Sequence, residues 1–347
     1  QMNLNLSYEM AQASDRDEEE KIQSKYRVLR EIYDHEKVFN QENLRNAKIE
    51  GREPYPTKDY TSFYHPLVLE EVRRVFKNMG ELYVKETSGM LDLESTHKAW
   101  AGYWYPFSDK SLYDGKDGQP GPLQLFDSLL RKMGHNSNIA DHERERHSGF
   151  NPDSWEGLCD LLGIASATTP EPHGPKTIHG VTFSVGMRKS LRTYSAFKWP
   201  TEKYGLSYHG NADSDGTYQN LKPEAWHQII VSSLEKNKVV VIDDTSGLPV
   251  WYKPLFRYRF KIQKDETIPH AYLVTGYPFL IKERKQETDT LTEHRDIFGP
   301  IYSYRLYVDE NYRNSKGGYL VIAGQWLGST YDNHPKAVKV PLALKEI

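Results

Sequence analysis

The order of the predicted elements is the feature of this sequence that most constrains its fold. Apolar residues recur at helical spacing from about Asp17 to Ala47, and prolines open further helices at Pro66, Pro122 and Pro223. Runs of β-branched and aromatic residues then predict strands over Val239 to Asp243, Val250 to Ile262, Ala271 to Ile281, Tyr302 to Val308 and Tyr319 to Trp326. Helices that precede a run of strands predict an α+β fold, in which helices pack against an antiparallel sheet.

The same patterns divide the chain into two parts. Residues 1–15 are predicted to be loose, and residues 1–95 are predicted to form a helical N-terminal extension. Residues 96–347 are then the main domain, with a cysteine-bearing helix packed against the sheet.

Composition excludes several classes of protein. Aromatic residues make up 12% of the 347 residues, which indicates a folded chain rather than a disordered one. The net charge of -3 gives no general attraction to nucleic acid, so no nucleic-acid partner is expected. No apolar stretch approaches the roughly 20 residues that span a bilayer, so no transmembrane segment is expected.

Cys159 is the single cysteine of the chain, which excludes an intramolecular disulfide and a multi-cysteine metal site. The turn-like stretch from Pro152 to Ser154 predicts a helix that begins just before Cys159, with Asp153 or Ser154 as its cap. A thiol in the first turn of a helix has its pKa lowered by the helix dipole, which favours a nucleophile. The alternative is a small buried side chain on the face shared with Leu162.

A thiol nucleophile needs a base and a residue that orients the base. His270 begins the strand His270-Ala-Tyr-Leu-Val-Thr-Gly-Tyr277, which resembles the histidine strand of papain-like cysteine hydrolases. Asp309 is predicted at the end of the next strand, where it could accept the imidazole N–H. The alternatives are a surface histidine at a strand end and a turn aspartate.

Other residues compete for these two roles. His334 is a rival base in a predicted loop. Asp243 and Asp244 are a rival acid pair, although a hairpin turn through Thr245-Ser246-Gly247 explains them without catalysis.

Six segments in order, between about residues 98 and 341, resemble the transglutaminase elicitor family. They are Tyr103-Trp-Tyr-Pro106, Pro122-Leu-Gln-Leu-Phe-Asp127, Trp155-Glu-Gly-Leu-Cys159 with Gly180-Val-Thr-Phe183, Val250-Trp-Tyr-Lys-Pro-Leu255, Tyr304-Arg-Leu-Tyr-Val-Asp309, and Gly324-Gln-Trp326 with His334-Pro335. The fourth segment resembles the elicitor peptide of that family. The resemblance implies a papain- and transglutaminase-like fold and a secreted or periplasmic protein. A single cysteine, where the oomycete enzymes carry several, points to a bacterial member.

The resemblance also implies a chemistry. The Cys159 thiolate would attack the carboxamide of a protein-bound glutamine, His270 with Asp309 would protonate the departing ammonia, and a lysine of a second protein would resolve the thioester into an isopeptide crosslink. The Cys159 N–H is one candidate donor to the oxyanion, and an indole N–H of Trp100 or Trp155 is another.

This chemistry requires no cofactor. The family resemblance implies possible calcium dependence, with Asp114 and Asp117, or Asp213 and Asp215, in oxygen-rich loops that lack the full ligand spacing of an EF-hand. Two other classes stay open: a cysteine protease or protein deamidase on the same scaffold, and a non-catalytic secreted recognition module in which Cys159 is buried and inert.

Overall fold

The computed structural model describes residues 2–50, 66–149, 151–205, 221–243, 251–327 and 335–342. Its α-helices are α1 Met2–Gln12, α2 Arg16–Glu50, α3 Pro66–Met79, α4 Ser111–Asp114, α5 Pro122–Lys132, α6 Ile139–Arg146, α7 Cys159–Thr168, α8 Val185–Ser195 and α9 Pro223–Glu235. Its strands are β1 Tyr83–Val84, β2 Leu91–Glu94, β3 Lys176–Ile178, β4 Val181–Phe183, β5 Thr201–Gly205, β6 Val240–Asp243, β7 Tyr252–Lys264, β8 Ala271–Ile281, β9 Ile297–Phe298, β10 Tyr302–Arg313, β11 Tyr319–Trp326 and β12 Ala337–Pro341.

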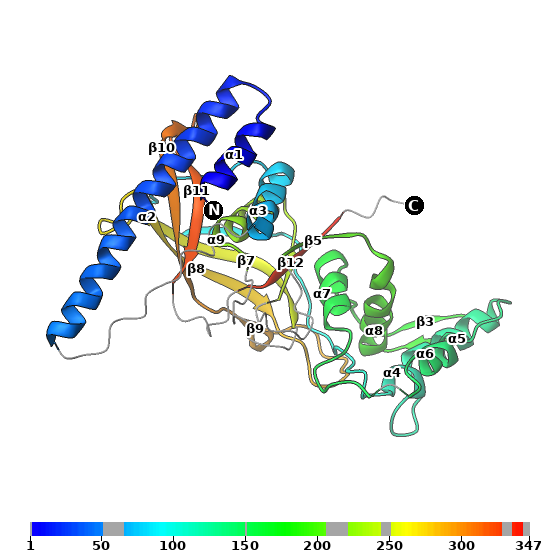
Figure 1. The fold of residues 1–347 in the computed structure, drawn as a ribbon. Coiled ribbons are helices and arrows are strands. Elements are labelled where there is room, and N and C mark those ends of the chain that lie inside the picture. Colours follow the sequence, from blue (N-terminus) through cyan, green and yellow to red (C-terminus); the bar gives the residue numbers. More distant parts are fainter. Residues whose placement is uncertain are drawn as a thin grey trace.

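One large sheet organises the molecule (Figure 1). Its strands follow the order β1-β11-β10-β8-β7-β6-β12-β5, with β2 beside β7 and β9 beside β8. The pairings in this sheet are antiparallel. Along the same edge of β7, the first half of the strand pairs with β6 and the second half pairs with β2. The predicted α+β fold with a large antiparallel sheet is therefore confirmed.

The largest part of the core lies between one face of the sheet and helix α9. Trp226, Ile229 and Ile230 of α9 are fully buried in one apolar cluster with Tyr258 of β7 and Leu306 of β10. Pro223 opens α9 at its first helical position, as predicted from the sequence.

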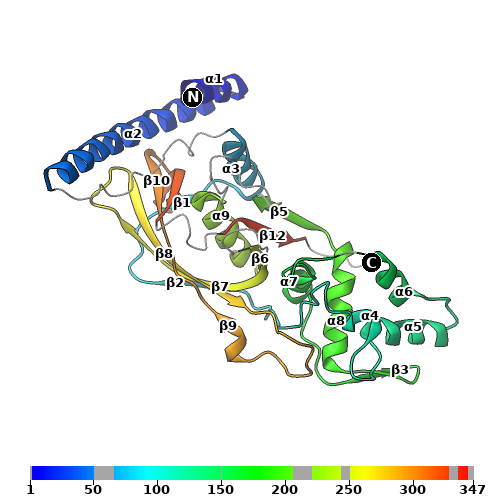
Figure 2. The same cartoon turned by 60° about the horizontal axis from the view of Figure 1, so that its bottom comes forward.

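Helices α2 and α7 cover the other face of the sheet at its two ends, as Figures 1 and 2 both show. Ala271 and Phe279 lie on the same face of β8, eight residues apart. Ala271 packs with Tyr26 and Leu29 of α2, whereas Phe279 packs against the cluster that contains α7. At 3.3 Å per residue, their separation along β8 is roughly 26 Å.

The N-terminal part of the chain differs from its prediction at its start. Residues 2–12, predicted to be loose, form α1, which packs against α2. Further along, α3 packs on α9, β1 pairs with β11, and β2 pairs with β7. None of the helices in the described ranges is long and apolar enough to cross a membrane.

Candidate active site

Cys159 is the first residue of helix α7, and Leu158 is its N-cap. The predicted caps, Asp153 and Ser154, lie before the helix and do not cap it. Asp153 instead closes a turn: its N–H donates to Glu156 Oε2 at 2.8 Å, and its carbonyl accepts from the Glu156 N–H at 3.0 Å. The helix therefore begins later than the polar residues suggest, directly at the cysteine.

The thiol of Cys159 is enclosed. Only 6% of the residue is exposed, in a cluster with Trp104, Val241 and Tyr252, and the backbone of Tyr252 hydrogen-bonds the thiol. Burial raises the pKa of the thiol to about 12, and nearby carboxylates add to this shift. The lowered pKa expected from the helix start is therefore wrong for this state, because desolvation outweighs the helix dipole.

Trp104 packs directly beside this helix start. The Leu158 N–H donates to the Trp104 carbonyl at 2.8 Å, and a Cβ at Gly157 would lie 2.5 Å from the Trp104 ring. A glycine is therefore required at position 157, because the Trp104 ring lies too close to leave room for a side chain. The Trp104 ring in turn meets Trp251 edge to face, with centroids 4.8 Å apart. The tryptophans of two sequence motifs therefore meet in the cluster that encloses Cys159.

Three carboxylates surround the thiol closely enough to raise its pKa: Asp160, Glu283 and Asp243. Asp160 accepts from Lys339 Nζ at 2.9 Å. Asp243 is fully buried at the end of β6, where Oδ1 accepts from the Trp251 N–H at 3.3 Å and its carbonyl accepts from the Lys336 N–H at 2.8 Å.

The burial of Asp243 was not predicted from the sequence, where a hairpin turn explained this residue. A signal was present, since Asp243 ends a fully buried strand and pairs directly with Tyr252 of the Val-Trp-Tyr-Lys-Pro-Leu motif. Asp244 and the turn through Thr245-Ser246-Gly247 lie outside the described residues.

His270 lies directly before β8 and faces helix α2. Its Nε2 is 3.1 Å from Glu31 Oε2, its Nδ1 is 3.6 Å from Glu310 Oε2, and its carbonyl accepts from the Val308 N–H at 2.8 Å. Its φ of 58° is in the left-handed region, which a non-glycine residue rarely adopts.

Asp309 lies near His270 but has a different partner. Its Oδ1 accepts from the backbone N–H of Asn311 at 3.0 Å and from Asn311 Nδ2 at 2.8 Å, and Oδ2 has no hydrogen-bond partner among the described residues. The strand does not end there, because β10 continues to Arg313.

The structure does not bring Cys159 together with His270 and Asp309. Ile281, the last residue of β8, packs in the apolar cluster that contains Cys159, whereas His270 precedes β8. The 11 residues of β8 place its two ends roughly 33 Å apart at 3.3 Å per residue. His334, the rival base, lies outside the described residues.

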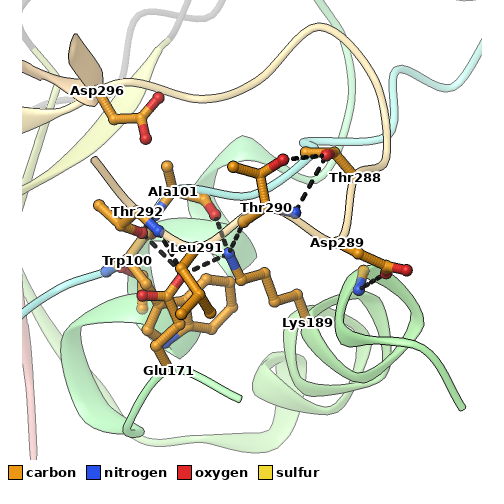
Figure 3. A network of polar contacts seen from close by, with 12 residues as sticks. Trp100, Ala101, Glu171, Lys189, Thr288, Asp289, Thr290, Leu291, Thr292 and Asp296 are labelled. Carbon is orange, nitrogen blue, oxygen red and sulfur yellow. Dashed lines mark hydrogen bonds and ion pairs between the residues drawn. The ribbon is translucent and has the colours of Figure 1, made fainter. Parts of the chain in front are cut away.

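Lys189 of α8 organises the chain around the far end of α7 (Figure 3). Its buried Nζ donates to the Ala101 carbonyl at 2.8 Å and to the Thr290 carbonyl at 3.3 Å, and lies 2.5 Å from Glu171 Oε1. Glu171 also accepts from the N–H and hydroxyl of Thr292. This network fixes the loop that follows β8, whose first residues include Glu283.

Trp100 is not available to an oxyanion as the sequence suggested. Its indole N–H donates to the Thr169 carbonyl at 2.9 Å, at the opposite end of α7 from Cys159. Trp155 is half-buried before the helix. The Leu161 N–H already donates to Asp160 Oδ1 at 2.8 Å. The N–H groups of Cys159 and Asp160 are the candidate donors, because a helix offers its first N–H groups no internal carbonyl.

Of the two predicted cation loops, the structure describes the one that holds Asp114 and Asp117. Asp114 forms an ion pair with Arg144, with 2.6 Å between Nε and Oδ1. Asp213 and Asp215 lie outside the described residues, and the described part of the chain contains no group of three or more His, Cys, Asp or Glu residues that could hold a metal ion.

Comparison with known proteins gives one informative likeness. No protein-family model and no curated protein matches the sequence. The fold is similar to the crystal structure of the GP42 transglutaminase from Phytophthora sojae, with a TM-score of 0.57 and 17% sequence identity over 78% of this chain and 90% of that one. The chain therefore has a fold like that of a GP42 transglutaminase, with Cys159 at the start of α7.

Proposed function

We propose that this protein is an acyltransferase that joins glutamine to lysine side chains through a thioester on Cys159. The observation that carries the proposal is the position of the single cysteine, at the first residue of a helix packed on the sheet of a fold similar to a transglutaminase. The proposed substrates are proteins, and secretion of the enzyme is part of the same proposal.

The proposed reaction has two balanced steps. Cys159 Sγ bonds to the glutamine carbonyl carbon, the C–N bond breaks, and the thiol proton leaves with ammonia. A lysine amine then attacks the thioester carbonyl carbon, the C–S bond breaks as the amide C–N bond forms, and a proton from the amine returns to sulfur. The N–H groups of Cys159 and Asp160, at the start of α7, would stabilise the oxyanion in both steps.

Asp243 is the carboxylate that we propose for proton transfer, because it is fully buried and pairs with Tyr252, whose backbone hydrogen-bonds the Cys159 thiol. The roles of His270 and Asp309 remain predictions from the sequence, and their distance from Cys159 argues for a base elsewhere. Calcium dependence is likewise a proposal from resemblance, tested by assaying the protein with calcium and with a chelator.

A second candidate function is a non-catalytic recognition module. The burial of Cys159 and the rise of its thiol pKa to about 12 favour this alternative. A deamidase or a cysteine protease on the same scaffold would use the same thiol with water in place of lysine.

The test is incorporation of a fluorescent primary amine into a glutamine-containing protein. We expect incorporation by the wild-type protein, none by Cys159→Ser, and a large loss with Asp243→Asn, with folding verified by circular dichroism. His270→Ala should retain activity, and His334→Ala tests the rival base. Ammonia release without incorporation indicates a deamidase, peptide cleavage indicates a protease, and no reaction supports the recognition module.

A further inference from the structure

We propose that a cavity beside the first turn of α7 binds an aromatic side chain of the glutamine-bearing substrate, with an acidic residue of that substrate at Arg146. This inference rests on the proposed function and names its substrate class. The cavity has a volume of about 490 Å³, within the range of ligand sites in proteins.

The cavity adjoins the proposed nucleophile. Leu158 and Asp160, the two neighbours of Cys159, both line it, while Cys159 itself packs toward Trp104 and Tyr252. Consecutive Cα atoms are about 3.8 Å apart, and an extended peptide advances about 3.3 Å per residue. A substrate whose glutamine reached the thiol would therefore have neighbouring residues within reach of the cavity.

The walls of the cavity suit an aromatic ring. Phe107, Leu161 and Phe197 line it together with the ring of Tyr194. Phe197 is 59% exposed, which leaves a large apolar surface uncovered at the mouth. An aromatic side chain of a substrate would bury this surface, and rings favour edge-to-face contacts of this kind.

The two carboxylates of the lining already have protein partners. Glu143 receives the Tyr194 hydroxyl at 3.0 Å and lies 3.0 Å from His147 Nε2, and Asp160 pairs with Lys339. Burial and Glu143 raise the pKa of Tyr194 to about 12, so its hydroxyl stays protonated as a donor. Neither carboxylate therefore calls for a cationic ligand.

Arg146 is the lining cation that faces solvent. Its side chain is 68% exposed, and its Nη1 is 3.8 Å from Glu143 Oε2, a long and weak pairing. A carboxylate on the substrate would complement this guanidinium at the rim. The substrate segment that fits this cavity has an aromatic residue beside the reacting glutamine, for the apolar lining, and an acidic residue next to it, for Arg146.

The test measures binding without chemistry. Fluorescence polarisation measures the binding of short fluorescent peptides to the Cys159→Ser protein. Each peptide contains a glutamine, with Phe or Ala beside it. The residue next to that position is Glu or Lys. The Phe and Glu peptide should bind about tenfold more tightly than the Ala and Glu peptide, as expected for burial of a ring. Phe197→Ala should remove this preference, and Arg146→Glu should reverse the preference for Glu over Lys.

Two matched controls use exposed residues away from the cavity. Ile301→Ala removes an apolar side chain that is 64% exposed. Arg16→Glu reverses the charge of a side chain that is 88% exposed. Neither change should alter the peptide affinities. Equal affinities for the Phe and Ala peptides, or a preference that survives Phe197→Ala, would overturn the subsite. Selective binding without amine incorporation by the wild-type protein would support the subsite and overturn only the transferase.

Discussion

The rings of Trp104 and Trp251 meet edge to face, with centroids 4.8 Å apart, in the cluster that encloses the Cys159 thiol. Trp104 is held in this position by the Leu158 N–H and by Gly157, whereas Trp251 is only partly buried. A substrate that reaches the thiol must therefore displace part of this cluster, and Trp251 is the less constrained of the two rings.

Removing the Trp251 ring should expose the thiol. Trp251→Ala should increase the rate of Cys159 alkylation by iodoacetamide about tenfold at pH 8, since hydration returns the thiol pKa toward its ordinary value and each pH unit changes the thiolate fraction tenfold. Alkylation is followed by intact-protein mass spectrometry, with Phe197→Ala as the control. An unchanged rate for Trp251→Ala would show that another group encloses the thiol.

The alkylation rate of the wild-type protein should depend steeply on pH. With the thiol pKa at about 12, the thiolate fraction rises about tenfold per pH unit from pH 7 to pH 10 without a plateau. An unfolded thiol, with its ordinary pKa, should approach its plateau in that range. A plateau for the folded protein near pH 7 would mean that the resting state already holds a thiolate.

The Lys189 network should contribute to stability as a unit. Lys189→Met leaves the Glu171 carboxylate buried without its cation, and should lower the free energy of unfolding by about 3–5 kcal/mol. The double variant Lys189→Met with Glu171→Gln should recover part of this loss, because no uncompensated charge remains. Urea denaturation of the single and double variants measures both values, and a loss below about 1 kcal/mol for Lys189→Met would contradict the buried ion pair.

His227 predicts a loss of stability in acid. It is buried in α9 with Nδ1 2.5 Å from the Tyr304 hydroxyl, and burial lowers its pKa to about 3. Between that pKa and its unfolded value near 6.5, the unfolded state binds more protons, so stability rises with pH by up to about 1.4 kcal/mol per pH unit. Urea denaturation at several pH values measures the slope.

Glu224 acts in the opposite sense over part of this range. Burial raises its pKa to about 7, so the folded state binds more protons between pH 4.5 and pH 7 and stability falls as pH rises. Glu224→Gln therefore removes the opposing effect and isolates His227. The slope of stability against pH is then compared between Glu224→Gln and the double variant Glu224→Gln with His227→Gln. Equal slopes would show that His227 does not titrate in this way.

The sequence predicted the elements well where the apolar period was strong. The helices that open at Pro66, Pro122 and Pro223 and the strands before and after His270 are present, as is the break of α7 before Pro170. The short strands β1, β2, β5 and β12 were missed, because they take their stability from neighbouring strands rather than from their own pattern.

The candidate site was only partly predictable. A helix start near Cys159 was predicted, although from Asp153 and Ser154, which do not cap the helix. The burial of Cys159 depends on Trp104 and Tyr252, which are distant in the sequence. The order Cys159, His270, Asp309 carries no information about which end of a strand each residue occupies. Because β8 is long and crosses the sheet, its first residue faces α2 while its last residues approach α7.

The central claim is that Cys159 forms a thioester with a glutamine side chain. Intact-protein mass spectrometry of the protein mixed with a glutamine peptide, quenched in acid, measures this intermediate directly. We expect the mass of the protein to increase by the mass of the peptide less one ammonia, through an adduct on Cys159. This adduct should be absent from Cys159→Ser and should be removed by added lysine. Absence of any adduct, together with a thiol that reacts with iodoacetamide only in denaturant, would contradict it.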